Sequence, residues 1–259
     1  MMQQKIDSKF KTFSPRDYLN EYYTHIGSEN LSLLKFFVKV YKKTPKNALL
    51  LEFGGGPTIY ALISATNIVK EIHFADFLKK NLNEVKLWKY ASSEAFNWSE
   101  FISTALKIEG SINIDKKKIK LREKLLRKKL TKFLLCDAFK NAPLGKKYVN
   151  FYDIVNVNFV LDSITSSKKI WERSLSNICN LLKKNGTLIM SALKNATYWR
   201  TGNRFFPAVN LDEKDIKVIF SKLGLQILSF SSISAEILDE KSKNYEGYKG
   251  MMFISAKKT

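Results

Sequence analysis

Apolar and polar positions alternate along the chain with two different spacings. Apolar runs of strand length are followed by stretches in which apolar residues recur every three or four positions. This alternation is typical of an α/β domain whose mostly parallel sheet carries helices on both faces. The first run, residues 48–53, is apolar except for Glu52, as expected of a strand covered on both sides. The pattern predicts a doubly wound α/β fold.

The same periodicities place the other elements. Residues 57–65, which follow three glycines, are expected to form a helix with Pro57 near its first position, where the missing N–H costs nothing. A helix with Leu82, Val85 and Trp88 spaced by three follows the second strand. The stop signal Lys184-Asn185-Gly186 is expected to end another helix. The remaining expected elements are strands at 72–75, 133–136, 154–157 and 187–190, a helix at 212–223 closed by Gly224, and an antiparallel edge hairpin from 225–230 and 251–256.

Two regions fall outside this repeating pattern and could supply a cover for a substrate. In residues 1–46, Ser14 is a candidate N-cap for a helix with Asp17 in its first turn. In residues 99–131, a basic amphipathic helix is expected at 116–129, as an insertion before the third strand. The residues assigned to its apolar side are Ile119, Leu121, Leu125, Leu126 and Leu130.

Length and composition favour one folded domain over residues 1–259. The apolar fraction is 45%, which is enough to offset the entropy of ordering the chain. No run of about 18 apolar residues occurs, and the first residues have no hydrophobic stretch typical of a signal peptide. The two cysteines, Cys136 and Cys179, are too few for a disulfide framework and are expected to be buried. We expect a cytoplasmic protein that does not enter the membrane and acts as a monomer.

The formal net charge of +20 raises the possibility of a nucleic-acid partner. However, arginine occurs only at positions 16, 122, 127, 173, 200 and 204, and the other positive charges are lysines. Arginine is the residue suited to bidentate contacts with phosphates and bases, so a lysine-dominated excess favours a solvated surface instead. Nucleic acid is therefore an unlikely partner from this pattern.

The turn Gly54-Gly55-Gly56-Pro57-Thr58 between the first strand and the following segment is the main candidate for a ligand site. Glycines let a ligand approach the backbone closely, and such a turn serves dinucleotides, nucleoside triphosphates or no ligand at all. The dinucleotide motif would need a glycine at Ile59, and the Gly-Lys-Ser/Thr of a phosphate loop is absent. Because Pro57 also removes an N–H donor, a ligand without phosphate fits best.

Two acidic residues follow the neighbouring strands. Asp76 stands 22 positions after Gly54, at the end of the second strand, where a carboxylate can accept hydrogen bonds from both ribose hydroxyls of an adenosine group. Asp137, after the third strand, is suited to the adenine amino group. Helix capping is the alternative for Asp76, and a turn aspartate is the alternative for Asp137. His25 and His73 have no metal-ligand spacing, His73 is expected to be structural, and no metal site is predicted.

Several short segments then resemble one known family. They are Asp17-Tyr18-Leu19, Tyr22-Tyr23, Gly54-Gly55-Gly56-Pro57-Thr58-Ile59-Tyr60, Asp76 with Asn81-Leu82, Glu94-Ala95-Phe96-Asn97-Trp98, Cys136-Asp137, Leu161-Asp162, and Ala192-Leu193-Lys194 with Tyr198. In this order they resemble the nicotinamide, phenylethanolamine and thioether methyltransferases, which use S-adenosyl-L-methionine and release S-adenosyl-L-homocysteine. The resemblance implies a Rossmann-like class I fold with a seven-stranded, mostly parallel sheet, an N-terminal helical lid and a helical insertion before strand three.

The resemblance also implies roles for individual residues. Tyr18 and Tyr23 match tyrosines that fold over the cofactor. Gly54, Gly55 and Tyr60 match contacts to its methionine end, and Gly56 and Thr58 belong to the same turn. The expected adenosine and strand-four contacts are Asp76, Asn81, Asp137, Ala138 and Asn158. In the mechanism that this implies, the acceptor's lone pair approaches in line and the protein supplies alignment and exclusion of water.

The acceptor side departs from the family. Relatives that methylate amines carry an acidic residue directly before Ala-Leu-Lys, where this chain has Ser191, which cannot balance an ammonium charge. Asp162 is retained as a candidate catalytic group that could orient an amine or take its proton, with helix capping as the alternative. The other expected acceptor contacts are Tyr22, Ser191, Tyr198 and the stretch 199–206.

These features predict a methyltransferase acting on a small molecule, with nitrogen favoured over sulfur or oxygen as the acceptor. A nucleic-acid methyltransferase is the second hypothesis. The segment Asn156-Val157-Asn158-Phe159 lacks the Asn/Asp-Pro-Pro-aromatic motif that holds a flipped base, which counts against it. A cofactor-binding homologue without activity is the third, because Ser191 permits it.

Overall fold

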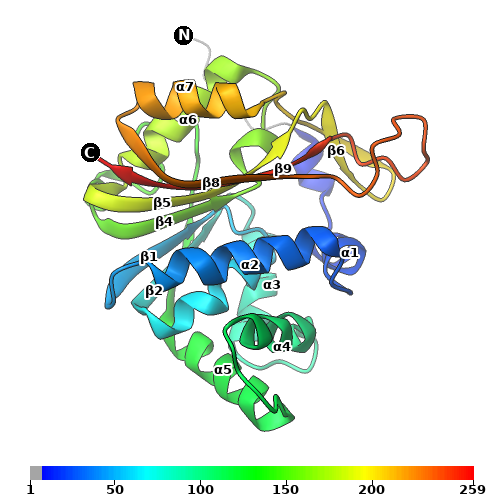
Figure 1. Ribbon diagram of the computed structural model, residues 1–259, viewed down its shortest axis with the longest axis vertical. Helices are drawn as coiled ribbons and strands as arrows, with labels where there is room; N and C mark the ends of the chain where they lie inside the picture. Colours follow the sequence, from blue (N-terminus) through cyan, green and yellow to red (C-terminus); the bar gives the residue numbers. More distant parts are fainter. Residues whose placement is uncertain (1–7) are drawn as a thin grey trace.

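β1 (Ala48–Phe53) is buried at every position and lies in the middle of the fold, as its apolar sequence predicts. The computed structural model describes residues 8–259, so the first part of the expected N-terminal region, residues 1–7, lies outside the described residues. β1 belongs to a seven-stranded sheet with the order β3-β2-β1-β4-β5-β9-β8 (Figure 1). The other strands of this sheet are β2 (Val69–Asp76), β3 (Leu130–Leu135), β4 (Tyr152–Asn158), β5 (Leu182–Lys194), β8 (Leu225–Ser234) and β9 (Gly250–Lys258).

The pairing of the strands is parallel on one side of the sheet and antiparallel on the other. β1 pairs in parallel with β2 and β4, β2 with β3, and β4 with β5, whereas β9 is antiparallel to both β5 and β8. The mostly parallel sheet and its edge hairpin are therefore confirmed. The strand order changes direction at β1, with β2 on one side and β4 on the other, and ligands of such folds bind at this switch point.

Helices cover both faces of the sheet (Figure 1). On one face Leu50 packs into a core with residues of the helices that precede β3, and on the other Leu51 packs with Trp171 and Phe220. The first group consists of α2 (Ser28–Lys42), α3 (Lys79–Lys89), α4 (Ser99–Ile108) and α5 (Lys116–Lys129), and the second of α6 (Lys168–Cys179) and α7 (Glu213–Lys222). The two-faced architecture follows from the pleat, because neighbouring residues of a strand point to opposite faces.

The expected helix at 57–65 is wrong. The structure has two short 3-10 helices there, η2 (Tyr60–Leu62) and η3 (Ser64–Asn67). Side chains from other elements take the carbonyls that an α-helix would use: Tyr41 donates to the carbonyl of Ala61, and Arg122 donates to that of Ile63. The segment is buried throughout, so it has no exposed polar face to favour a regular helix.

The signal Lys184-Asn185-Gly186 does not end a helix. α6 ends at Cys179, and Leu182 already pairs with Tyr152. The register between β4 and β5 then shifts before Thr187, and Asn185 has a φ of 65°. A residue with positive φ suits a β-bulge as well as a helix end, and in this segment it belongs to the irregular start of β5.

The basic helix α5 has the predicted bounds but a different apolar side. Leu126 and Leu130 are buried, whereas Leu121 and Leu125 are exposed. Arg122 turns inward instead, because it forms a bidentate ion pair with Glu109 at 2.6 Å and 2.9 Å. A buried charge requires such a partner, and here the partner lies on the preceding loop.

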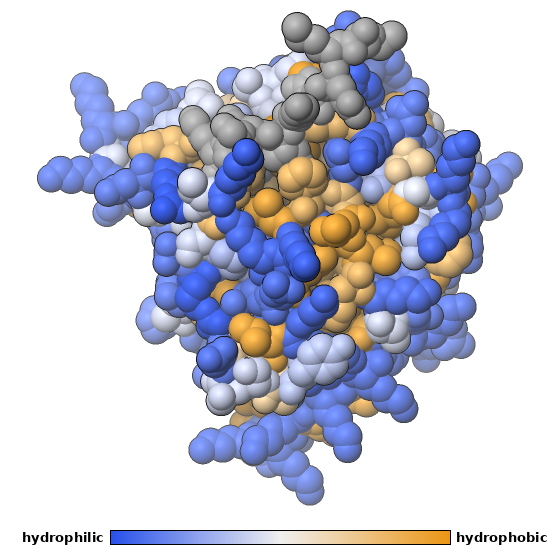
Figure 2. Space-filling model, turned by 180° about the vertical axis from the view of Figure 1, so that it is seen from behind, coloured by the Kyte–Doolittle hydropathy of each residue, from blue (hydrophilic) through white to orange (hydrophobic). Residues whose placement is uncertain are grey.

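Two smaller predictions are confirmed in the described residues. Cys136 and Cys179 are buried and free. His73 is buried, with hydrogen bonds to the Tyr152 hydroxyl at 2.9 Å and to Glu71 at 3.0 Å, which is a structural role. Within residues 8–259, no helix combines the length and the apolar character needed to span a membrane. Figure 2 shows that hydrophilic residues cover most of the face opposite to Figure 1, while apolar residues gather near its middle.

Candidate active site

A cleft opens at the carboxyl ends of β1, β2 and β4, at the switch point of the sheet. It has a volume of about 810 Å³, including its open mouth, which is in the range of small-ligand sites. We call it the strand-end cleft. Its lining residues are Phe10, Phe13, Tyr18, Phe53, Gly54, Gly55, Gly56, Pro57, Thr58, Tyr60, Asp76, Phe77, Leu78, Asn81, Cys136, Ala138, Asn158, Phe159, Val160, Ser163, Ile164 and Trp199.

The glycine turn brings the backbone to the floor of this cleft. Gly54 has a φ of +66°, and a Cβ there would lie 2.6 Å from a methyl carbon of Val160. At Gly55 a Cβ would lie 2.4 Å from the ring of Phe74. No other residue fits either position, because Gly54 needs a left-handed backbone and Gly55 lies directly on an aromatic ring. Packing within the protein therefore requires glycine at both positions, and the role of the turn in close ligand approach stays a prediction.

Asp76 joins the glycine turn to the second strand. Its Oδ2 accepts the N–H of Gly56 at 2.9 Å, and its Oδ1 accepts the N–H of Leu78 at 2.7 Å and the amide of Asn81 at 3.0 Å. Burial raises the pKa of Asp76 to about 6, although these hydrogen bonds oppose the rise. The Phe77 backbone N–H also contributes a hydrogen bond to this carboxyl group, so Asp76 is held firmly at the wall of the cleft.

Asn81 supplies an independent sign of a missing partner. Its Nδ2 is used by Asp76, but its Oδ1 is buried and has no hydrogen-bond partner among the described residues. A buried acceptor without a donor is costly, and a ligand hydroxyl in the strand-end cleft would satisfy it. The pair of Asp76 and Asn81 therefore fits the ribose of an adenosine group.

Of the three residues that follow β3, two line the cleft and one does not. Ala138 and Cys136 line it, and the Ala138 carbonyl accepts a hydrogen bond from Asn177 on α6 at 3.0 Å. Asp137 does not line it, because its Oδ1 accepts the N–H of Phe139 at 3.0 Å and closes the local turn. The predicted adenine contact of Asp137 is thus not seen in the walls of this cleft, and the alternative of a turn aspartate describes its place.

A buried polar network supports the cleft from below. Asn156 donates to Glu52 at 2.9 Å, Asn158 donates to Glu52 at 3.5 Å, and the Ser191 hydroxyl donates to Asn158 at 3.0 Å. Burial raises the pKa of Glu52 to about 7. Asn158 reaches the cleft, whereas Ser191 lies behind it, so the serine holds Asn158 in place instead of facing a ligand.

The N-terminal tyrosines lie beside the two cavities of this site, and we call the segment that carries them the lid. α1 (Pro15–Tyr22) begins at the predicted cap, with Ser14 accepting the N–H of Asp17. The ring of Tyr23 stacks on that of Tyr60, with centroids 5.3 Å apart, and its hydroxyl lies 3.3 Å from that of Tyr18. Burial raises the pKa of Tyr18 to about 12, so the lid presents neutral hydroxyls and aromatic faces.

The rest of the cover combines Trp199 and Phe206, from the expected acceptor stretch 199–206, with Phe10 and Phe13, which the sequence did not indicate. Phe10 and Phe13 line the strand-end cleft and pack against Trp199 and Phe206, whose rings stack with centroids 4.3 Å apart. Trp199 and Phe206 come from a small second sheet, β6 (Tyr198–Thr201) with β7 (Arg204–Pro207). The only available signal for Phe10 and Phe13 was their aromatic spacing just before the helix cap.

A second cavity adjoins the first under the same cover. We call it the lid pocket. It shares Tyr18, Phe159, Ser163 and Trp199 with the strand-end cleft, and we call these four residues the shared wall. Phe159 has a φ of 53°, an unusual conformation for an aromatic residue that is often found at functional sites. The other residues that line the lid pocket are Tyr22, Tyr23, Glu29, Asn30, Leu33, Leu193, Tyr248 and Met251.

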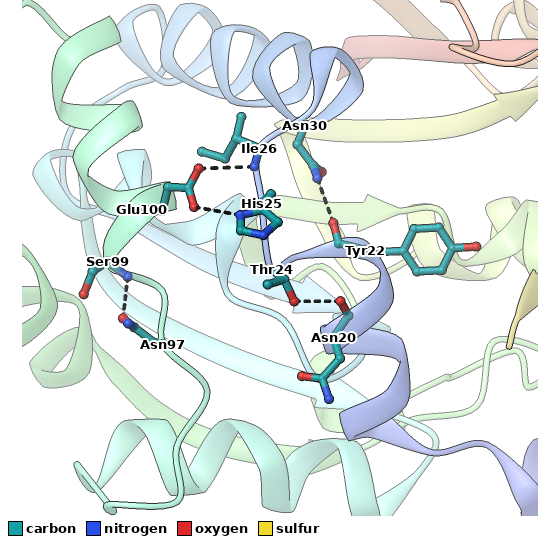
Figure 3. A network of polar contacts seen from close by, with 9 residues as sticks. All are labelled: Asn20, Tyr22, Thr24, His25, Ile26, Asn30, Asn97, Ser99 and Glu100. Carbon is teal, nitrogen blue, oxygen red and sulfur yellow. Dashed lines mark hydrogen bonds and ion pairs between the residues drawn. The ribbon is translucent and has the colours of Figure 1, made fainter.

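The lid is fixed to the body at the C-terminal end of α1. Tyr22 donates its hydroxyl to the Arg200 carbonyl at 2.6 Å, which ties α1 to β6. Figure 3 shows the linker after α1: Asn30 donates to the Tyr22 carbonyl at 2.8 Å, and Glu100 on α4 accepts the N–H of Ile26 at 3.3 Å and faces His25. The lid pocket therefore has a defined shape although its residues are far apart in sequence.

Asp162 lies beside the shared wall without forming part of it. It is buried in η5 (Leu161–Ser163), and its Oδ2 accepts the N–H of Leu193 at 2.8 Å. Burial raises its pKa to about 7. It lines neither cavity, while the next residue, Ser163, lines both.

Tyr198 also lies outside both cavities, in contrast to the prediction. Its ring packs edge-on against Phe205 and Tyr245. Consecutive residues of a strand point in opposite directions, so Trp199 faces the cavities and Tyr198 faces away. In the part of the chain that the structure describes, no group of three or more His, Cys, Asp and Glu side chains is arranged to hold a metal.

Comparison with known proteins shows the family to which this chain is related. A model of the NNMT/PNMT/TEMT family matches residues 2–259. The chain belongs to this family. Nicotinamide N-methyltransferase of Homo sapiens is 31% identical over 261 aligned positions, which cover 97% of this chain and 95% of that protein. Indolethylamine N-methyltransferase of Mus musculus is 28% identical, with 96% of this chain and 94% of that protein covered.

Solved structures agree on the fold. The N-methyltransferase NodS of Bradyrhizobium japonicum, in complex with S-adenosyl-L-homocysteine, superposes with a TM-score of 0.57 at 11% identity and covers 97% of this chain and 99% of its own. The Rossmann-like methyltransferase fold is thereby confirmed. As a member of the NNMT/PNMT/TEMT family, the chain is a methyltransferase that uses S-adenosyl-L-methionine as its methyl donor.

Proposed function

We propose that this chain methylates a nitrogen atom of a small molecule that binds in the lid pocket. The observation that carries the proposal is the shared wall: a donor in the strand-end cleft and an acceptor in the lid pocket would meet between Tyr18, Phe159, Ser163 and Trp199. The relatives methylate nicotinamide, indolethylamine and phenylethanolamine according to their names, which supports nitrogen as the acceptor atom.

The cofactor contacts follow the walls of the cleft. We assign the ribose to Asp76 and Asn81, because both line the cleft and Asn81 Oδ1 lacks a donor among the described residues. The adenine lies by Ala138 and close to Asp137, whose side chain already closes its own turn. The methionine end faces the glycine turn. The residues assigned to that end are Gly54, Gly55, Gly56, Thr58, Tyr60 and Asn158, with Tyr18 and Tyr23 above them.

The protein contributes alignment and exclusion of water. When bound, S-adenosyl-L-methionine supplies a methyl group on a positively charged sulfur. Tyr18 and Trp199 close the shared wall, and their aromatic faces attract positive charge in a space from which water is displaced. Tyr22, whose hydroxyl is held by Arg200, limits the acceptor's orientation from the lid side.

Asp162 receives a different role from the one that the sequence suggested. Its Oδ2 is directed at the N–H of Leu193, and Leu193 lines the lid pocket. We assign Asp162 as a positioning residue for that wall instead of a base in contact with the acceptor. Ser191, whose hydroxyl is bonded to Asn158, supports the cofactor side in the same indirect way.

The test uses radiolabelled S-adenosyl-L-methionine with pooled small amines, heterocyclic nitrogen compounds, thiols and phenols, and separately with RNA. We expect label in the nitrogen compounds, and S-adenosyl-L-homocysteine should bind in calorimetry. Label that enters RNA, thiols or phenols but no nitrogen compound would contradict the proposal. The basic helix α5 contributes no residue to either cavity, which gives the nucleic-acid alternative no support from the site. We further propose a cytoplasmic enzyme that works as a single-domain monomer.

A further inference from the structure

Two carboxyl groups, Glu29 in the lid pocket and Glu246 behind Tyr248, share one hydroxyl. The Tyr248 hydroxyl lies 2.9 Å from Oε2 of Glu29 and 2.7 Å from Oε2 of Glu246. A tyrosine hydroxyl has one proton and can donate to only one of the two carboxylates. The other carboxylate is left facing a hydroxyl oxygen, so this arrangement lacks a donor when both glutamates are ionised.

The surroundings do not supply that donor. Among the residues that the structure describes, neither Glu29 nor Glu246 forms an ion pair with a lysine or arginine. Arg200 is the nearby cation that favours the ionised form of Glu246, whereas Glu21 and Glu236 add negative charge. Burial is the largest cause of a raised pKa for both Glu29 and Glu246. A protein with a net charge of +20 thus carries a concentration of negative charge at this one pocket.

The two carboxyl groups lie away from the reaction centre. Glu29 and Tyr248 line the lid pocket but do not line the strand-end cleft, and Glu246 is reached through Tyr248. The acidic side chains at the lid pocket come from α2, which carries Glu29, and from the segment before β9, which carries Glu246.

We propose that the methyl acceptor carries an ammonium group in addition to the nitrogen that is methylated, and that Glu29, with Glu246 across Tyr248, binds this ammonium group. The inference rests on the proposed function, because it assumes that the lid pocket holds the acceptor. An ammonium group has three donors, which supply the bond that Tyr248 cannot make. Charge-assisted bonds of this kind are among the strongest in proteins.

The reaction remains balanced with such an acceptor. A neutral nitrogen at the shared wall forms a bond to the methyl carbon while the carbon–sulfur bond breaks and its electron pair stays on sulfur. The ammonium group at Glu29 keeps its protons throughout, so Glu29 is a binding residue for specificity and not a base. A heteroaromatic nitrogen with an aminoalkyl arm has both features.

Two probes of nearly equal shape test the inference: 3-(aminomethyl)pyridine, whose arm is charged, and 3-(hydroxymethyl)pyridine, whose arm is neutral. We expect wild-type protein saturated with S-adenosyl-L-homocysteine to bind the charged probe at least about tenfold more tightly in calorimetry. Glu29→Gln should remove this preference, lowering affinity for the charged probe about tenfold and changing that for the neutral probe less than about threefold. Glutamine keeps an oxygen for the Glu236 N–H that Glu29 accepts, so the local fold is retained.

Glu172→Gln is the matched control, because Glu172 lies on α6, on the other face of the sheet, and pairs with Lys222. It removes one negative charge and should leave the preference unchanged. If Glu29→Gln fails to fold, Glu246→Gln makes the same test. Equal binding of both probes by wild type, or equal losses in Glu29→Gln and Glu172→Gln, would overturn the inference. Failure to bind S-adenosyl-L-homocysteine at all would instead overturn the proposed function.

Discussion

The strand-end cleft and the lid pocket are neighbours with different origins. Most of the cleft is built on the carboxyl ends of parallel strands, and eight residues, 53–60, contribute seven of its lining positions. The lid pocket is assembled from α1, α2, β5, β6 and the start of β9, which are far apart in sequence. A site on strand ends is fixed by the sheet itself, whereas a site under a lid depends on side-chain contacts between distant segments. The first can remain constant while the second changes its ligand.

Among changes that separate the strand-end cleft from the lid pocket, Gly54→Val is expected to have the largest effect on binding. Valine at a φ of +66° is strained and would meet Val160, so affinity for S-adenosyl-L-homocysteine should fall at least about 100-fold. Calorimetry measures it. Gly110→Val is the control, since Gly110 also has a positive φ, +95°, but no atom lies within 4 Å of its Cβ position. Equal losses of binding in both variants would show that backbone strain alone, not the cleft floor, causes the effect.

The second effect is a pH dependence of cofactor-product binding that arises from Asp76 in the strand-end cleft. The carboxyl group of Asp76 accepts hydrogen bonds fully at both oxygens only when it is ionised, because protonation turns one oxygen into a donor, and its pKa is raised to about 6. Affinity for S-adenosyl-L-homocysteine should be constant above pH 6 and fall by up to about tenfold per unit below it. Asp76→Asn should bind more weakly and show no such dependence. The folding stability of the unliganded protein should depend on pH in the opposite sense. Because the pKa of Asp76 is higher in the folded state, this group adds stability below the ordinary pKa of 3.8, and that stability is lost as pH rises through about 6.

Trp199→Ala tests the boundary between the strand-end cleft and the lid pocket, because Trp199 lines both cavities. Loss of the indole removes stacking with Phe206 and part of the cover, so KM for the acceptor should rise about tenfold. Affinity for S-adenosyl-L-homocysteine should fall less than about threefold, because the strand-end contacts remain. Steady-state kinetics and calorimetry together decide it. A larger loss on the cofactor side would mean that the cover, not the sheet, holds the donor.

The smallest effect is expected from Ser191→Ala. Its hydroxyl makes one hydrogen bond, to Asn158, worth about 1 kcal/mol, so affinity for S-adenosyl-L-homocysteine should fall about fivefold. Discrimination between charged and neutral acceptors should not change, because Ser191 lines neither cavity. A change in that discrimination would return Ser191 to the acceptor side, where the sequence had placed it.

The same contrast explains what could be predicted from the sequence. The positions of the strands, the glycine turn and Asp76 depend on neighbours in sequence, such as the apolar run before Gly54, and these positions agree with the structure. Asp137 and Tyr198 were placed within one or two residues of the cavities, but a turn and the alternation of a strand direct their side chains elsewhere. Glu29 could not be found, because its importance depends on Tyr248 and Glu246, more than two hundred positions later.

The shared wall has a consequence for inhibitor design. Since Tyr18, Phe159, Ser163 and Trp199 separate the two cavities by no more than a common boundary, one molecule could fill both. An adenosyl group joined through a short chain to a ring with an ammonium arm would bind its second half at a high effective concentration, which can raise affinity by about 10²–10⁴ over either half. Selectivity within the family would then come from the half that reaches Glu29, and potency from the half that lies on the glycine turn.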